Sequence, residues 1–300
     1  MRIILFTTSF LTAIVLAVVT IKISFKKKIL DYPKATSVHT KPTPMLGGVV
    51  IFFTFFSICF ISGNTGNLLP LFIASFVMII GGLYDDLKAM TASQKLFIQF
   101  ASSVIVISFG IVITQARIPF GPFLKLGIFS IPITICWFVL MSNLMNIIDG
   151  LDGLASGLAA VTLFTLLVFA RDACVASQIL ILTGAVSGFL LLNFNPSKIF
   201  LGNNGSTFLG FAIAYLALTT SQKSTIMPIL ILPCVVMGIQ LTDIVYAIVR
   251  RAKTKKNIFK GDKKHIHHMI LNATGNHKGT VLMFYAISVV LAFMIVGLTK

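Results

Sequence analysis

The chain contains no glutamate and few charged residues of any kind. All eight acidic residues are aspartates, and only 11% of the 300 residues are charged. A soluble domain of this size carries about 25% charged residues. Hydrophobic residues make up 57% of the chain, and the mean hydropathy is +0.98. This composition excludes an ordinary soluble domain, because several apolar runs approach the roughly 20 residues that a membrane-spanning helix needs.

Cysteine is also scarce, and the chain has no internal repeat and no low-complexity tail. The four cysteines lie in or beside apolar runs without metal-site spacing, so we interpret them as small buried side chains. The first apolar run has no small-residue cleavage site, which favours a retained span over a signal peptide. We therefore predict a single integral membrane domain over residues 1–300.

The predicted fold is all-α, a polytopic membrane protein with about ten to eleven transmembrane helices. The candidate spans are residues 3–24, 46–62, 68–84, 96–114, 127–147, 155–171, 176–194, 206–221, 226–248 and 280–298. Between the fourth and fifth spans, residues 116–127 could form a small hairpin or an interfacial segment.

The net charge of +16 suggests either a nucleic-acid partner or a membrane protein with basic cytoplasmic loops. With ten spans, seventeen lysines and arginines fall in one set of segments and six on the opposite side. The positive-inside rule then places both termini outside and the five richer segments in the cytoplasm. We expect contact with membrane lipid and no nucleic acid, and a site on the cytoplasmic face.

Two polar clusters lie early in the cytoplasmic segments. Residues 31–48 combine three prolines with a glycine pair, which indicates a shaped loop, a plain connector being the alternative. The second cluster has the adjacent Asp85 and Asp86 at the inner end of the third span. Two adjacent carboxylates there are electrostatically costly unless a cation or proton offsets their charge, which indicates metal or phosphate chemistry. The alternative is a helix-end charge pair balanced by Lys88 and Lys95.

The stretch NLMNIIDGLDGLASG, residues 143–157, has the most specific pattern. Asn146, Asp149 and Asp152 are spaced by three, which on a helix keeps them near one face. The glycines between them would instead loosen the helix and let a ligand approach the backbone. Either arrangement can point one amide and two carboxylates into a common cavity. A helix terminus with unrelated polar residues is the alternative.

The stretch FLGNNGSTFLG, residues 200–210, has a similar glycine content but no aspartate. Ser206 could cap the following helix, and free amide groups at a helix N-terminus suit phosphate oxygens; a plain turn is the alternative. Asp243 lies inside the ninth predicted span. An ionisable group there is a functional candidate, unless it pairs with Arg250 or Arg251.

The basic segment near the C-terminus contains the run DKKHIHHMI. His265, His267 and His268 lie within four residues, without a cysteine nearby, so an anionic ligand is more natural than zinc. A basic loop facing anionic lipid would account for the lysines but not for the histidines. Acidic and basic groups on one membrane face suggest a polyanion bridged by Mg²⁺, which prefers carboxylate and phosphate oxygens. Such a site could join a soluble nucleotide substrate to a lipid one.

With these five motifs in this order, the chain resembles the polyprenyl-phosphate N-acetylhexosamine-1-phosphate transferases. The run HIHH is similar to the N-acetylglucosamine-1-phosphate transferases that start O-antigen, enterobacterial common antigen and teichoic acid synthesis. The resemblance implies that undecaprenyl phosphate attacks the sugar-proximal phosphorus of a UDP-N-acetylhexosamine and that UMP leaves. It also implies a bacterial inner-membrane enzyme that uses Mg²⁺, with Mn²⁺ as a substitute, and a homodimer is consistent with the family.

The resemblance assigns roles to individual residues. Asp85 is the candidate base or orienting group for the lipid phosphate, and Asp86 lies beside it. The catalytic set is Asp85, Asp86, Asp149 and Asp152, and the metal set is Asp86, Asp149 and Asn203. The substrate-binding set is Asn146, Lys41, Thr43, His265, His267 and His268.

The chain departs from the family pattern at two places. Thr36 and Ser37 replace a basic pair before His39, which predicts weaker anion binding. The fourth motif usually reads Gly-Asp-x-Gly-Ser with the aspartate on magnesium, and here Asn203 takes its position. An amide keeps one carbonyl oxygen but loses the charge, so metal binding and catalysis should weaken. A natural variant with other ligands, a naturally impaired enzyme and an engineered substrate trap are all open, and the intact acidic motifs favour the last.

Two other classes of function compete with the transferase. An ion-coupled transporter would use Asp85, Asp86 and Asp243, but transporters place such groups near the midplane, often between repeats. Nearly all the polar clusters here lie at one predicted interface instead. A catalytically inactive protein that binds the lipid carrier is the other rival, and Asn203 is the feature that favours it.

Overall fold

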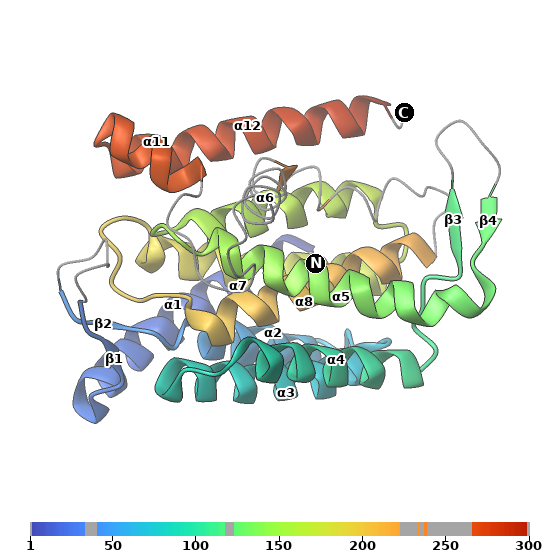
Figure 1. Ribbon diagram of the computed structural model, residues 1–300, viewed down its shortest axis with the longest axis horizontal. Helices are drawn as coiled ribbons and strands as arrows, with labels where there is room; N and C mark the ends of the chain where they lie inside the picture. The colour runs from blue at the N-terminus through green and yellow to red at the C-terminus, as the bar shows by residue number, and fades with distance from the viewer. Residues whose placement is uncertain are drawn as a thin grey trace, which may run out of the picture.

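The structure is a computed structural model that describes residues 2–33, 41–117, 123–222, 233, 237–238 and 266–298. The helices are α1 (Arg2–Lys27), α2 (Gly47–Ile61), α3 (Leu68–Lys88), α4 (Ala92–Ser108), α5 (Ser130–Ile148), α6 (Leu154–Phe169), α7 (Ala173–Asn193), α8 (Gly202–Gln222), α11 (Ile266–Thr274) and α12 (His277–Leu298). The strands are β1 (Leu30–Asp31), β2 (Thr43–Pro44), β3 (Gln115–Arg117) and β4 (Phe123–Lys125). In Figure 1 the long helices lie along the molecule, with the pair β1–β2 at one end and β3–β4 at the other.

Helices of membrane-spanning length dominate the described chain. Five are long and apolar enough to cross a membrane: α1, α3, α5 with its preceding 3-10 turn, α7 and α12. Three shorter apolar helices, α2, α4 and α6, accompany them. Every predicted span except the ninth overlaps one of the helices. The ninth, residues 226–248 with Asp243, lies almost wholly outside the described residues.

Two sequence predictions on the boundaries need correction. The fourth predicted span, 96–114, is displaced, because α4 starts at a capping box in which Thr91 and Gln94 bond each other's backbone N–H groups. The helix ends at Ser108, and Gly110 with φ of 80° turns the chain into an extended segment. The basic segment near the C-terminus, which we interpreted as a loop ending before the span 280–298, is partly helical, since α11 begins at Ile266.

The predicted hairpin between the fourth and fifth spans is confirmed for its described strands. β3 pairs antiparallel with β4, and Gln115 lies opposite Lys125. The other pair, β1–β2, joins the end of α1 to the start of α2 through Leu30 opposite Pro44. The two pairs therefore close opposite ends of the helical bundle (Figure 1).

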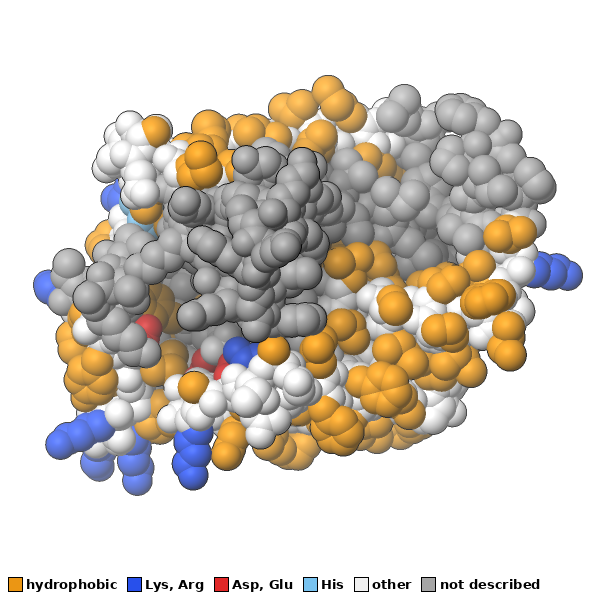
Figure 2. Space-filling view, in the orientation of Figure 1, with side chains coloured by type: hydrophobic (Ala, Val, Ile, Leu, Met, Phe, Trp, Pro, Cys, Tyr) orange, Lys and Arg blue, Asp and Glu red, His pale blue; other side chains and the backbone are white. Residues whose placement is uncertain are grey.

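α8 is the central helix of the described bundle, and its first turn carries part of the candidate site. It packs against α2, α3, α5, α6 and α7, and the hydrophobic residues from Phe208 to Leu218 are buried. By contrast, α1 and α12 expose large apolar side chains such as Leu11 and Phe293, as helices in contact with lipid do. Figure 2 shows hydrophobic side chains over much of the described surface, with most of the visible basic side chains toward its ends and one beside acidic side chains farther in.

Small residues allow α1 to pack closely on α7. A Cβ atom at Gly188 would lie 2.3 Å from the carbonyl oxygen of Phe10, and one at Gly184 would lie 2.5 Å from that of Phe6. Ser9 adds a hydrogen bond from Oγ to the carbonyl oxygen of Ile181, at 2.6 Å. Close backbone approach and such hydrogen bonds are the usual means by which apolar helices associate in a membrane.

Candidate active site

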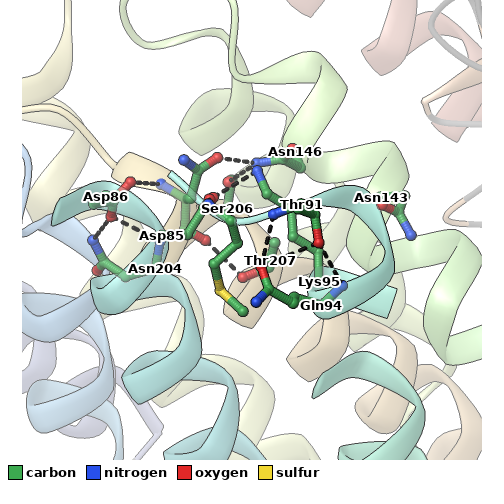
Figure 3. A network of polar contacts seen from close by, with 12 residues as sticks. Asp85, Asp86, Thr91, Gln94, Lys95, Asn143, Asn146, Asn204, Ser206 and Thr207 are labelled. Carbon is green, nitrogen blue, oxygen red and sulfur yellow. Dashed lines mark hydrogen bonds and ion pairs between the residues drawn. The ribbon is translucent and has the colours of Figure 1, made fainter. Parts of the chain in front are cut away.

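Asp86, near the end of α3, caps the N-terminus of α8 from another helix. Its Oδ1 accepts the backbone N–H of Asn203 at 2.9 Å, and its Oδ2 accepts the backbone N–H of Asn204 at 3.1 Å and the Asn204 Nδ2 at 2.6 Å (Figure 3). α8 has no acidic residue in its first turn, so its positive end is neutralised by this carboxylate. The α8 amides that we expected to bind phosphate are therefore occupied by Asp86 in this structure.

Asn146 and Asn203 form a side-chain amide pair beside this cap. Asn146 Nδ2 donates to Asn203 Oδ1 at 2.8 Å and to Ser206 Oγ at 2.9 Å (Figure 3). Ser206 lies one turn inside α8, so it binds Asn146 instead of capping the helix. The structure thus brings together Asn146 and Asn203, two of the residues selected from different motifs.

Asp85 makes its contacts with the start of α4, away from Asp86. Its Oδ2 forms an ion pair with Lys95 Nζ at 2.6 Å, and its Oδ1 accepts the backbone N–H of Met90 at 2.7 Å. The Asp85 side chain is 5% exposed and the Lys95 side chain 34% exposed, so the carboxylate is buried while the lysine side chain is partly exposed. The sequence analysis offered the alternative that lysines balance the charge of the aspartate pair, and this is confirmed for Asp85 with Lys95.

A small cavity adjoins this ion pair. Its volume is about 20 Å³, room for roughly one water molecule. Its lining combines the polar residues Asp85, Lys95, Gln99, Asn203 and Thr207 with apolar residues of α3 and α4. Gln99 continues the polar wall toward α5, because its side-chain amide pairs with that of Asn143. Neither Lys95 nor Gln99 was among the selected site residues, since each sits in an unremarkable helical pattern.

The motif of Asp149 and Asp152 forms the turn between α5 and α6. Asp149 is the C-cap of α5, and Gly153 with φ of 81° is the N-cap of α6, so the glycine-loosened arrangement is the correct one. Asp152 Oδ2 accepts Asn195 Nδ2 at 3.0 Å and the backbone N–H of Ser197 at 3.2 Å. Burial raises the pKa of the Asp149 carboxyl group to about 8, and the charges of Asp86 and Asp152 contribute.

The remaining site residues from the sequence lie in the loop before α2 or outside the described part. Thr43 in β2 is buried, and its Oγ1 donates to the carbonyl oxygen of Lys41 at 3.0 Å. Lys41 is exposed beside it. The backbone N–H of Phe200 donates to the carbonyl oxygen of Pro44 at 2.8 Å, which places this loop against the start of α8. His265 lies outside the described residues, as do the side chains of His267 and His268, whose backbone belongs to α11.

Tyr285 of α12 holds the C-terminal helix against the aspartate turn. Its hydroxyl group donates to the carbonyl oxygen of Gly153, and a Cβ atom at Gly157 would lie 2.0 Å from that hydroxyl oxygen. His277, at the start of α12, interacts electrostatically with Asp152. Sequence spacing gave no signal for these contacts, because the Tyr285 and Gly153 positions are 132 residues apart.

A Tyr285→Phe variant should lower the melting temperature of the protein. It removes the one hydrogen bond that joins α12 to the carbonyl oxygen of Gly153, which still accepts the backbone N–H of Gly157. The expected loss is about 1 kcal/mol or about 2 °C. Thermal unfolding in detergent measures this. Tyr84→Phe is the matched control, because Tyr84 is 50% exposed. Equal melting temperatures for the Tyr285→Phe and Tyr84→Phe variants would contradict the proposed anchoring role.

The donor set at this end of the bundle suits a divalent cation. The charge of Asp86 disfavours ionisation of the Asp149 carboxyl group, and a divalent cation near both would favour the ionised form of each. Within the described part of the chain, no three histidine, cysteine or acidic side chains converge closely enough to form a metal site of their own. That fits Mg²⁺, which takes one or two carboxylates and completes its shell with water and substrate phosphate. Asn203 offers a carbonyl oxygen, already hydrogen-bonded to Asn146.

An apolar helical bundle with carboxylates, amides and a lysine gathered at one end defines a multi-pass membrane protein with a polar active-site candidate. The chain belongs to glycosyl transferase family 4, whose model matches residues 68–221. That range contains the Asp85–Asp86, Asn146–Asp152 and Asn203–Ser206 motifs.

Curated relatives match over most of the chain. The chain is 33% identical to a probable undecaprenyl-phosphate N-acetylglucosaminyl 1-phosphate transferase of Bacillus subtilis, over 94% of this chain and 80% of the relative. It is 33% identical to the undecaprenyl-phosphate alpha-N-acetylglucosaminyl 1-phosphate transferase of Thermotoga maritima, over 92% and 83%. The Escherichia coli K12 protein of the same description is 28% identical, over 84% and 71%.

Proposed function

We propose that the chain transfers N-acetylglucosamine-1-phosphate, or a related N-acetylhexosamine-1-phosphate, from a UDP-sugar to undecaprenyl phosphate. UMP is released, and the lipid-linked product starts a cell-envelope polysaccharide in the bacterial inner membrane. The observation that carries this proposal is the meeting of Asp86, Asn146 and Asn203 beside the Asp149 turn. The descriptions of the relatives support the acceptor and donor classes.

The lipid phosphate and the nucleotide sugar would bind on different sides of the site. Lys95 places a partly exposed positive charge next to Asp85, so the lipid phosphate would bind there, with Asp85 as its base or orienting group. Asp86, Asp149 and Asn203 would hold Mg²⁺ or Mn²⁺, with Asp152 adjacent. When bound, the metal would neutralise charge on the departing UMP. Asn146, Lys41, Thr43 and the histidines would contact the nucleotide sugar.

The test is UMP release by the purified protein in detergent. UDP-N-acetylglucosamine would be supplied with and without undecaprenyl phosphate and Mg²⁺, and UDP-glucose would serve as the control donor. Release that requires the lipid phosphate, the metal and the N-acetyl group supports the proposal. Release without the lipid phosphate would indicate hydrolysis, and the absence of release with every N-acetylhexosamine donor would reject the transferase.

An impaired, substrate-binding protein is the second candidate. It is favoured by the neutral Asn203, whose carbonyl oxygen already accepts a hydrogen bond from Asn146. This candidate predicts binding of UDP-N-acetylglucosamine, measured by calorimetry, without release of UMP.

A further inference from the structure

Asn204 joins three separate segments of the site through one amide group. Its Nδ2 donates to the carbonyl oxygen of Met45 at 2.8 Å and to Asp86 Oδ2 at 2.6 Å. Met45 lies between β2 and α2, Asp86 lies in α3, and Asn204 itself lies in the first turn of α8. The residue is therefore the point where the Lys41–Thr43 loop, the aspartate pair and the central helix are connected.

The orientation of this amide is fixed by its surroundings. Asn204 is fully buried, and a Cβ atom at Gly48 would lie 2.2 Å from its Oδ1, while one at Gly82 would lie 2.3 Å from its Cα. Both hydrogens of Nδ2 are used, whereas Oδ1 is buried without a hydrogen-bond partner. Burying an oxygen without a hydrogen-bond partner costs free energy. The two hydrogen bonds from Asn204 Nδ2 are formed despite this cost at Oδ1.

We propose that Asn204 is a positioning residue that fixes the Asp86 carboxylate, ties it to the loop at Met45 and limits its capacity for a metal ion. The inference rests on the proposed transferase function. In the family pattern Gly-Asp-x-Gly-Ser, Asn204 occupies the open position, so the resemblance assigns it no role. Asn203 and Asn204 would then both weaken metal binding. Asn203 replaces a carboxylate by a neutral amide, and Asn204 occupies acceptor sites on the Asp86 carboxylate.

The restriction on the metal follows from the acceptor capacity of a carboxylate. A carboxylate has roughly four lone-pair sites, and N–H donors occupy three of those on Asp86. Removing the Asn204 side chain should therefore make Asp86 a better metal ligand while it loosens the position of the carboxylate.

The experiment compares Asn204→Ala with the parent protein by Mn²⁺ binding and by kinetics. Electron paramagnetic resonance of the purified protein in detergent measures free Mn²⁺ and needs no turnover. We expect the Mn²⁺ dissociation constant to fall about threefold, which corresponds to the loss of one competing hydrogen bond. We expect kcat to fall about tenfold because the carboxylate is less well placed, and KM for the UDP-sugar to change less than about twofold.

Gln178→Ala is the matched control variant. Gln178 is also a buried amide, and its Nε2 donates to the carbonyl oxygens of Asn64 and Gly66 in the α2–α3 connection, at 3.1 Å and 2.8 Å. Gln178 contacts the chain just before the start of α3, whereas Asp86 lies near the end of that helix. Its loss should therefore lower the melting temperature without altering Mn²⁺ binding. If Asn204→Ala does not fold, Asn204→Ser retains a small polar group and should shift Mn²⁺ binding in the same direction.

Unchanged or weaker Mn²⁺ binding in the Asn204 variants would overturn the inference. The inference would also be overturned if kcat fell no more in Asn204→Ala than in Gln178→Ala. If the parent protein releases no UMP, the proposed function fails, but the Mn²⁺ comparison still decides the role of Asn204.

Discussion

Replacing Asp86 by asparagine should lower kcat for UMP release by about 1,000-fold, the range expected when a group that stabilises charge in the transition state is lost. The carboxylate accepts three N–H bonds from the start of α8. An amide can present only one oxygen, so its NH₂ group would face N–H donors of the positive helix end. The substitution therefore removes a proposed metal ligand and disturbs the turn that carries Asn203.

Asp172→Asn separates the helix-capping contribution from the chemical one. Asp172 also caps a helix N-terminus, since its Oδ1 accepts the backbone N–H of Val175 at 2.9 Å at the start of α7. Asparagine and aspartate are comparable N-caps, so this variant should retain near-parental kcat and melting temperature. Radiolabelled UMP release and thermal unfolding would be measured for both variants. An Asp86→Asn variant with more than about one tenth of the parental kcat would contradict a central role for this carboxylate.

The sequence predicted where helices lie better than how they pack. Long apolar runs indicated α1, α3, α5 and α7 because composition alone marks them. The sequence did not indicate that α8 lies at the centre of the bundle. An apolar run has the same composition whether its helix faces lipid or other helices. The displaced α4 shows the same limit, because its true start depends on the capping box at Thr91.

The candidate site shows which interactions the sequence can signal. Adjacent or regularly spaced polar residues in an apolar chain selected Asp86, Asn146 and Asn203, which the structure brings together. Asp85 and Asp86 are neighbours in sequence but contact different helices. Asn204 and Tyr285 act through partners 118 and 132 residues away, and local spacing contains no information about such pairs.

Asn203→Asp should increase both the affinity for Mg²⁺ and the rate of UMP release, each by about tenfold, because a charged oxygen is a much better ligand for a hard cation than an amide oxygen. The new carboxylate can still accept the hydrogen bond from Asn146 Nδ2, which now lies 2.8 Å from Asn203 Oδ1. Mg²⁺ titrations of the rate measure the effect. Asn64→Asp, in the α2–α3 connection, is the control for adding a negative charge outside the site.

The same substitution should also make stability depend on the metal. A carboxylate at position 203 would lie beside Asp86, whose charge already disfavours ionisation of Asp149, and would add repulsion there. In EDTA the Asn203→Asp variant should therefore melt below the parent protein, and saturating Mg²⁺ should raise its melting temperature more. A larger Mg²⁺-dependent rise with a faster rate would mean that Asn203 impairs an otherwise complete transferase site. The same rise without a faster rate would mean that Asn203 weakens metal binding but does not limit the chemistry, and no rise would place the metal away from residue 203.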